Sequence, residues 1–166
     1  MATTYEPIAT TTLSSAASTI TFSSIASSWT DLRLVFVVSA TSAGIYPRFN
    51  FNNDTSTNYS STRLYGDGTS AASQANTSTN RLSPLAVSDV STSQFNLLSM
   101  NIFSYAGSTN KTVLMEGNAD KNGSGTVERS VGLWRSTSAI NRIDIISGTS
   151  TFTSGTTATL YGIKAA

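Results

Sequence analysis

The side chains that perform most protein chemistry are few in this 166-residue chain, which contains no histidine and no cysteine. These two residue types supply the usual general base near neutral pH, the commonest zinc ligand and the thiolate nucleophile. A serine nucleophile without histidine needs a lysine base, and Lys111, Lys121 and Lys164 form no recognisable arrangement. The nine acidic residues are scattered, and no pair stands out for glycoside hydrolysis. We therefore expect no enzyme, and the sequence indicates no catalytic or cofactor-binding residue.

A pattern that resembles a calcium loop begins at Asp120 and runs to Glu128. Oxygen-bearing side chains fall at its first, third and fifth places, and glycine falls at its sixth. The twelfth place needs an acidic residue that binds calcium through both oxygens, but this place is Val131. The flanking residues also have the alternation of strands. We therefore expect a hairpin turn at Asn122-Gly123 and no metal site.

Aromatic and arginine side chains are the remaining candidates for binding. The aromatic residues can stack on sugar rings or anchor a protein interface, and they can equally belong to the core, because most lie within strand patterns. The arginines in the last third of the chain can reach a polar partner surface or lie on solvated strand edges. The aromatic candidates are Trp29, Tyr46, Tyr59, Tyr65, Tyr105 and Trp134, and the arginines are Arg129, Arg135 and Arg142.

The composition limits the classes of partner that we expect the chain to bind. Charged residues make up 11% of it and the formal net charge is +1, which is too weak a field to favour nucleic acid or an anionic membrane. The longest apolar run, Leu34 to Val38, is too short to span a bilayer, and the first residues do not resemble a secretory signal. Few charges oppose close packing of identical copies, so ordered self-association is compatible with the composition.

Hydrophobic residues alternate with a period of two over most of the chain, which is the pattern of β-strands. Leu32, Leu34, Phe36 and Val38 share one face of such a strand. The pattern predicts one all-β domain over residues 1–166, an antiparallel, jelly-roll-like β-sandwich of eight to ten short strands, with residues 1–6 as an extended arm. The expected strands are Pro7–Leu13 at an edge, Ile20–Phe22, Leu32–Val38, Tyr46–Phe51, Asn58–Tyr65, Gln94–Tyr105, Thr112–Gly117, Val127–Trp134, Ile140–Ser147 and Thr157–Lys164.

Three segments depart from simple alternation. Gln94–Tyr105 is apolar on both faces, which predicts a central strand or one that lies between the core and a partner surface. Ser23–Trp29 has a capping serine and apolar residues four apart, which predicts one short helical turn. Thr69–Asn80 has no large apolar residue and is expected to form a long loop.

Several stretches of the chain resemble a family of small virion proteins of tailed bacteriophages, notably those that infect cyanobacteria. Together they cover about half of the chain and include both ends, in matching order and spacing. The middle, Ala71–Ser93, matches least. The matching stretches are Tyr5–Ala9, Leu13–Asp31, Asn58–Ser70, Val131–Ile143 and Phe152–Ile163.

The resemblance implies a β-rich, jelly-roll-like module of the phage particle, made in the host cytoplasm and without catalytic residues. The expected function is that of a capsid cement or decoration protein on the capsid exterior, whose partners are the major capsid protein and two further copies of itself in a homotrimer. The alternative is a tail or fibre module that binds carbohydrate on the host surface.

Overall fold

The computed structural model describes residues 4–42, 46–83, 94–120 and 124–164, and all regular elements in these ranges are β-strands. None of the described residues forms a helix that is long and apolar enough to cross a membrane. The strands are β1 (Tyr5–Thr12), β2 (Thr19–Phe22), β3 (Asp31–Val38), β4 (Arg48–Phe51), β5 (Tyr59–Gly66), β6 (Ala71–Thr79), β7 (Asn96–Phe103), β8 (Lys111–Asp120), β9 (Gly125–Trp134), β10 (Ile143–Ile146) and β11 (Thr157–Ile163).

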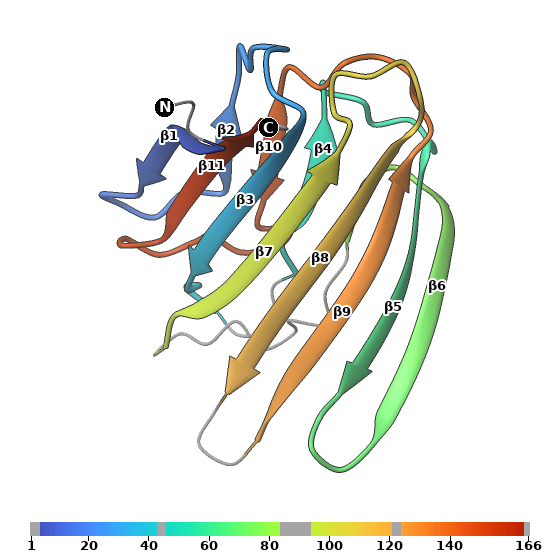
Figure 1. Ribbon diagram of the computed structural model, residues 1–166. Helices are drawn as coiled ribbons and strands as arrows, with labels where there is room; N and C mark the ends of the chain where they lie inside the picture. The colour runs from blue at the N-terminus through green and yellow to red at the C-terminus, as the bar shows by residue number, and fades with distance from the viewer. Residues whose placement is uncertain (1–3, 43–45, 84–93, 121–123, 165–166) are drawn as a thin grey trace.

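The strands form two antiparallel sheets, which confirms the predicted all-β sandwich. The large sheet has the order β1-β11-β3-β7-β8-β9-β5-β6, and the small sheet has the order β2-β10-β4. β1 therefore lies beside β11, and β2 lies beside β10. β3 lies on the other side of β11, and β4 lies on the other side of β10. This interleaving is that of a jelly roll. Figure 1 shows the small sheet behind the upper part of the large sheet, whereas the lower ends of β8, β9, β5 and β6 extend beyond it.

The core lies between the two sheets and follows the predicted alternation. In β3 the side chains of Leu32, Leu34, Phe36 and Val38 are buried, and the residues between them face away from the core. Phe152, which lies between β10 and β11, packs edge-on against Phe36 with ring centroids 5.3 Å apart. The small sheet contributes a matching apolar face. The buried apolar residues of the small sheet are Ile20, Phe22, Phe49, Phe51, Ile143 and Ile145.

Strand β6 shows that the predicted loop over Thr69–Asn80 is wrong. Residues Ala71–Thr79 pair antiparallel with β5, from Ala71 opposite Gly66 to Thr79 opposite Tyr59. β6 is the last strand of the large sheet, and most of its side chains are exposed. A strand without a buried face needs no apolar alternation, so the pattern that marks other strands is missing here.

The helical turn predicted at Ser23–Trp29 is also absent, because tertiary hydrogen bonds take the place of helical ones. The backbone N–H of Ile25 donates to the carbonyl of Asn141 at 3.0 Å, and the N–H of Trp29 donates to the hydroxyl of Tyr105 at 3.2 Å. The segment is therefore irregular and anchored from two distant parts of the chain.

The N-terminal segment joins the large sheet earlier than predicted. Strand β1 begins at Tyr5, which pairs with Ile163, while Glu6 pairs with Gly162. The last two residues of the expected arm over residues 1–6 are thus held in the sheet, and residues 1–3 lie outside the described residues.

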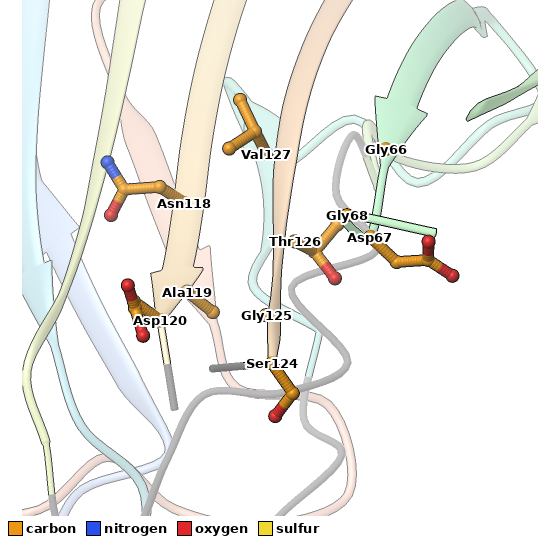
Figure 2. Close-up of a pocket in the computed structure, with 10 residues that line it drawn as sticks. All are labelled: Gly66, Asp67, Gly68, Asn118, Ala119, Asp120, Ser124, Gly125, Thr126 and Val127. Atoms are coloured by element: carbon orange, nitrogen blue, oxygen red, sulfur yellow. The ribbon is translucent and has the colours of Figure 1, made fainter. Parts of the chain in front are cut away.

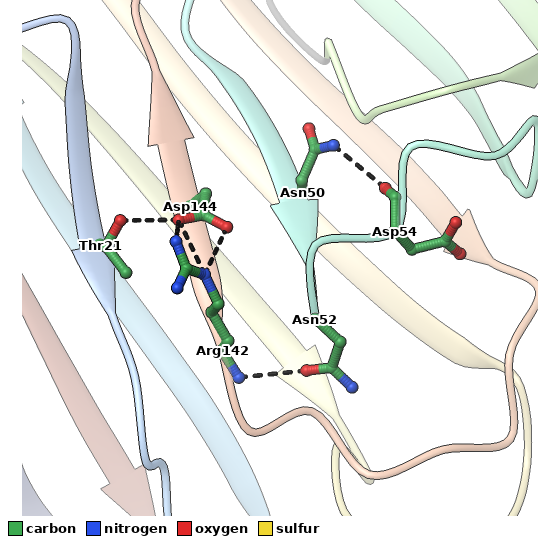
Figure 3. Close-up of polar contacts among 6 residues, drawn as sticks. All are labelled: Thr21, Asn50, Asn52, Asp54, Arg142 and Asp144. Carbon is green, nitrogen blue, oxygen red and sulfur yellow. Dashed lines mark hydrogen bonds and ion pairs between the residues drawn. The ribbon is translucent and has the colours of Figure 1, made fainter.

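A polar cluster lies on the small sheet, where Thr21 of β2 pairs opposite Asp144 of β10 (Figure 3). The guanidinium of Arg142 donates to the buried carboxylate of Asp144, with an Nη2–Oδ1 distance of 2.8 Å, and the hydroxyl of Thr21 donates to the same oxygen at 2.6 Å. Burial raises the pKa of Asp144. These hydrogen bonds and the charge of Arg142 together have the larger effect, so the pKa lies below its usual value. The cluster therefore keeps Asp144 ionised and joins β2 to β10.

Asp54 links the loop that leaves the small sheet to the large one. Its carboxylate accepts hydrogen bonds from the indole N–H of Trp134 in β9 at 2.7 Å, from the N–H of Ser56 at 2.9 Å and from Asn58 Nδ2 at 3.1 Å. Burial alone would raise the pKa of Asp54, but these donors outweigh it and lower the pKa from 3.8 to about 2. The ionised form is thus the one that the fold stabilises.

We expect Asp54→Asn to lower the free energy of unfolding by about 1.5–3 kcal/mol at pH 7. The reason is that the hydrogen-bond donors around Asp54 would no longer have a negatively charged acceptor. Since the folded pKa lies below the unfolded value, this contribution is present above about pH 4 and is lost as the pH falls through about 2. Urea unfolding of both proteins between pH 2 and 7 measures it, with the exposed neighbour Thr55→Ala as control, expected within about 0.5 kcal/mol of wild type. An equal difference between Asp54→Asn and wild type at pH 2 and pH 7 would contradict the assignment.

Candidate interaction surfaces

The lysines and acidic residues that the sequence analysis considered for chemistry are dispersed in the described part of the chain. Within it, no three His, Cys, Asp or Glu side chains lie close enough together to hold a metal ion. Lys111 is buried and its ammonium donates to the backbone carbonyls of Gly107 and Thr109, so it is bonded within a turn. Lys164 lies over the ring of Trp29 at 4.8 Å from the centroid, and Lys121 lies outside the described residues.

The segment that resembles a calcium loop belongs to a hairpin, as predicted. Strands β8 and β9 pair antiparallel as far as Asp120 opposite Gly125, while the turn residues Asn122-Gly123 lie outside the described residues. Glu128 pairs opposite Gly117, three residues before Asp120 along β8, so the two acidic side chains lie on opposite faces of the sheet. They cannot ligate one ion.

A cavity of about 450 Å³ lies between the tips of the β8–β9 and β5–β6 hairpins (Figure 2). Its two acidic side chains, Asp67 and Asp120, point away from one another in the figure. The carboxylate of Asp67 accepts hydrogen bonds from the N–H groups of Thr69 and Ser70 at 2.8 and 2.7 Å, which lower its pKa and hold its own turn. The Asp67 carboxylate therefore stabilises the turn between β5 and β6.

The six aromatic candidates do not form a common binding site. Tyr59 and Trp134 are buried and stacked with ring centroids 6.2 Å apart, and Tyr105 is buried as well. Trp29 packs against the core, and Tyr65 is half-buried beside Arg63. Tyr46 alone among the six is exposed.

The three arginines singled out in the sequence have separate partners. Arg129 pairs with Glu116 at 3.4 Å, Arg142 pairs with Asp144, and Arg135 donates to the carbonyl of Thr57 at 2.7 Å. The arginines that do converge were missed. They are far apart in the sequence and follow no common spacing, and they line one cavity: Arg48, Arg63 and Arg81.

Exposed apolar side chains gather on the outer face, by which we mean the face of the large sheet turned away from the core. Residue pairing places Val35, Ser99, Glu116, Arg129 and Leu64 in one row across β3, β7, β8, β9 and β5. Six apolar side chains on this face are between 36% and 70% exposed. They are Val37, Leu64, Leu97, Phe103, Val127 and Val131.

Strand β7 has the two apolar faces that the sequence predicts. Leu98, Met100 and Ile102 are buried in the core, whereas Leu97 and Phe103 are exposed on the outer face. The strand is the fourth of eight in the sheet, so it is both central and exposed on one side. Tyr105, which follows β7, is the exception to the alternation because it turns into the core.

Charge on the outer face is low and partly compensated. The exposed ion pair between Glu116 and Arg129 lies between two shallow grooves of about 460 and 300 Å³. Val35, Leu97 and Val127 line the larger groove. Contiguous exposed apolar surface on a soluble protein marks an interaction site. The outer face is therefore our candidate docking surface.

The two edges of the large sheet differ in how they are protected. β1 carries Glu6 and Pro7 and has an irregular register between Pro7 and Ala9, features that discourage pairing with another chain. β6 has no charged residue and no proline. Because Asp67 donates its N–H to the carbonyl of Ser70, the antiparallel alternation turns the backbone groups of Ala71, Ser73 and Ala75 away from β5. Among the described strands none pairs with this side of β6, which we therefore call the open edge.

Comparison with protein-family models finds no match to this chain. No curated protein matches it. No solved structure matches it either. The features of the molecule that bear on its function are the outer face, the open edge of β6 and the arginine-lined cavity.

We expect calcium and its removal to leave stability unchanged, because Asp120 and Glu128 lie on opposite faces of the sheet. Thermal unfolding in excess EDTA and in millimolar calcium tests this, with the same melting temperature expected in both. A rise of several degrees in calcium that Asp120→Asn abolishes would contradict the assignment.

Proposed function

We propose that the chain is a structural protein of a phage virion, a capsid cement protein whose outer face docks on the lattice of the major capsid protein. The observation that carries this proposal is the outer face itself, which offers exposed apolar side chains on β3, β5, β7 and β9 and little net charge. The resemblance of about half of the chain to small virion proteins of tailed phages supports the setting.

Docking through such a face follows from ordinary burial. Complete burial of a Val or Leu side chain contributes roughly 1.5–3 kcal/mol, and Val127 and Leu64 still expose 70% and 62% of their surface. The hydroxyl side chains among them can bond to polar groups that an assembled shell presents. Each contact can be weak, because copies joined in one oligomer bind with high effective concentration.

We propose that this oligomer is a homotrimer in which the open edge of β6 in each copy contacts a different surface of the next copy. Outward-facing backbone groups on β6 offer hydrogen bonds without charge repulsion, since Ala71–Thr79 is neutral. A closed ring of three uses one head-to-tail interface, and it matches the three-fold positions of a capsid lattice. The absence of histidine and cysteine supports a binding role without catalysis.

The docking proposal is tested by co-sedimentation with shells assembled from the major capsid protein of the same phage. We expect wild-type protein to sediment with the shells and to raise their resistance to heat. The double substitution Val127→Glu and Val131→Glu is expected to weaken binding at least tenfold, because it places two charges in a face that must be desolvated.

Thr137→Glu adds a charge on the exposed loop between β9 and β10 and serves as the matched control, with wild-type binding expected. Circular dichroism confirms that all variants are folded. Binding to isolated tails and not to shells would overturn the capsid proposal in favour of the tail module. Unchanged shell binding by the double variant would refute docking through the outer face.

The trimer is tested by light scattering on wild type and on Ala75→Pro. The N–H of Ala75 faces away from β5, so proline there removes no internal hydrogen bond and blocks only the open edge. We expect a trimer for wild type and a folded monomer for Ala75→Pro. Ala72→Pro, which removes an N–H that faces β5, is expected to lower the melting temperature. A monomeric wild type, or a trimer of Ala75→Pro, would contradict the arrangement.

A further inference from the structure

A cavity of about 360 Å³ opens on the inner side of β5 and β6, beside the first residue of β4. Its arginines come from three segments: Arg48 begins β4, Arg63 lies in β5 and Arg81 follows β6. A short bridge brings two of these segments together, because Phe49 and Leu82 exchange backbone hydrogen bonds of 2.8 and 3.0 Å. Because the bridge is antiparallel, Arg48 and Arg81 flank it diagonally, and both line the cavity.

The described residues that line this cavity carry positive charge and no negative charge. Arg63 donates to the amide oxygen of Gln74, and Arg81 Nε donates to Asn80 Oδ1 at 2.9 Å, so both partners are neutral. No Asp or Glu is among the described residues that line the cavity. Burial and then the charge of Arg48 lower the pKa of Arg81, as expected for cations that crowd one another.

One donor of the arginines that line the cavity has no hydrogen-bond partner among the described residues. Nε of Arg63 is buried and unbonded, although Nη2 of the same guanidinium is bonded. A buried donor without a partner costs free energy, roughly 1–3 kcal/mol. An anion beside Arg63 would supply the missing acceptor, and it would offset the repulsion between Arg48 and Arg81.

The remaining lining is neutral and rich in hydrogen-bonding groups. Amides and hydroxyls surround the arginines, and the exposed ring of Tyr46 lies at the margin of the cavity. The volume lies at the small end of the range for ligand pockets, which suits a ligand about the size of one sugar ring. The neutral polar residues are Ser61, Gln74, Asn76, Thr79, Asn80 and Ser83.

We infer that this cavity binds an acidic sugar unit, one whose ring carries a carboxylate or a sulfate group. The guanidinium groups of Arg48, Arg63 and Arg81 bind the oxyanion, since their planar forks match carboxylate and sulfate oxygens. The amides and hydroxyls bind the sugar hydroxyls, and Tyr46 offers a flat face to the sugar ring. An acidic side chain of a protein would use the arginines and leave most of the neutral donors and acceptors without a role.

The cavity is separate from the outer face, because it lies on the opposite side of the large sheet. Gln74, whose neighbour Ser73 pairs opposite Leu64 of the outer face, projects to the other side and lines the cavity. Loss of capsid docking would leave this site intact, and loss of this site would leave docking intact.

The test is a titration of the full-length protein at low salt, followed by isothermal calorimetry and by amide chemical shifts. The probes are glucuronate, glucose 6-sulfate, unmodified glucose and N-acetylglutamate. We expect glucuronate or glucose 6-sulfate to bind at least tenfold more tightly than glucose and than N-acetylglutamate. The shifts are expected at Arg63, Gln74 and Asn80.

Arg63→Gln and, separately, Arg81→Gln are expected to weaken acidic-sugar binding at least tenfold, while the matched control Arg129→Gln on the outer face retains it. Two variants are used so that a folding defect of one does not decide the result, and melting temperatures identify such a defect. Equal binding of N-acetylglutamate would replace the acidic sugar with an acidic protein segment as the ligand. No saturable binding of either acidic sugar, or an equal loss in Arg129→Gln, would overturn the site.

Discussion

The alternation of β3 and β7 is the constraint on which the rest of the structure depends. One face of these strands carries Leu34, Phe36 and Met100 into the core, and the pleat then forces Val35 and Leu97 to the other side. A sheet of eight strands has two faces, and the small sheet covers only part of one of them. Exposed apolar surface is therefore a direct consequence of the architecture, and a second molecule is the simplest means of covering it.

The strands β8, β9, β5 and β6 distinguish this molecule from a plain jelly roll. They extend the large sheet beyond the interleaved part formed by β1, β11, β3 and β7 (Figure 1). All three candidate surfaces involve this extension. The outer face includes one side of it, the arginine-lined cavity lies against the other, and the open edge ends it. Both parts contribute residues to the core, and the extension carries the surfaces that we propose for partners.

Sequence reasoning predicted the parts of the fold in which one face is buried. The apolar alternation of β3 and both apolar faces of β7 were visible in the residue order. β6 was missed because an edge strand of Ala, Ser, Thr, Asn and Gln buries no face and so carries no pattern. The convergence of Arg48, Arg63 and Arg81 was missed for another reason, since it depends on the bridge between Phe49 and Leu82, which no local spacing encodes.

Electron cryomicroscopy of the assembled particle tests the central claim, that the outer face is the docking surface, most directly. We expect density for this protein on the capsid exterior at three-fold positions, with the strands of the large sheet against the major capsid protein and Leu97 and Val127 buried in the contact. Density at the tail, or density on the capsid with the outer face turned toward solvent, would contradict the account.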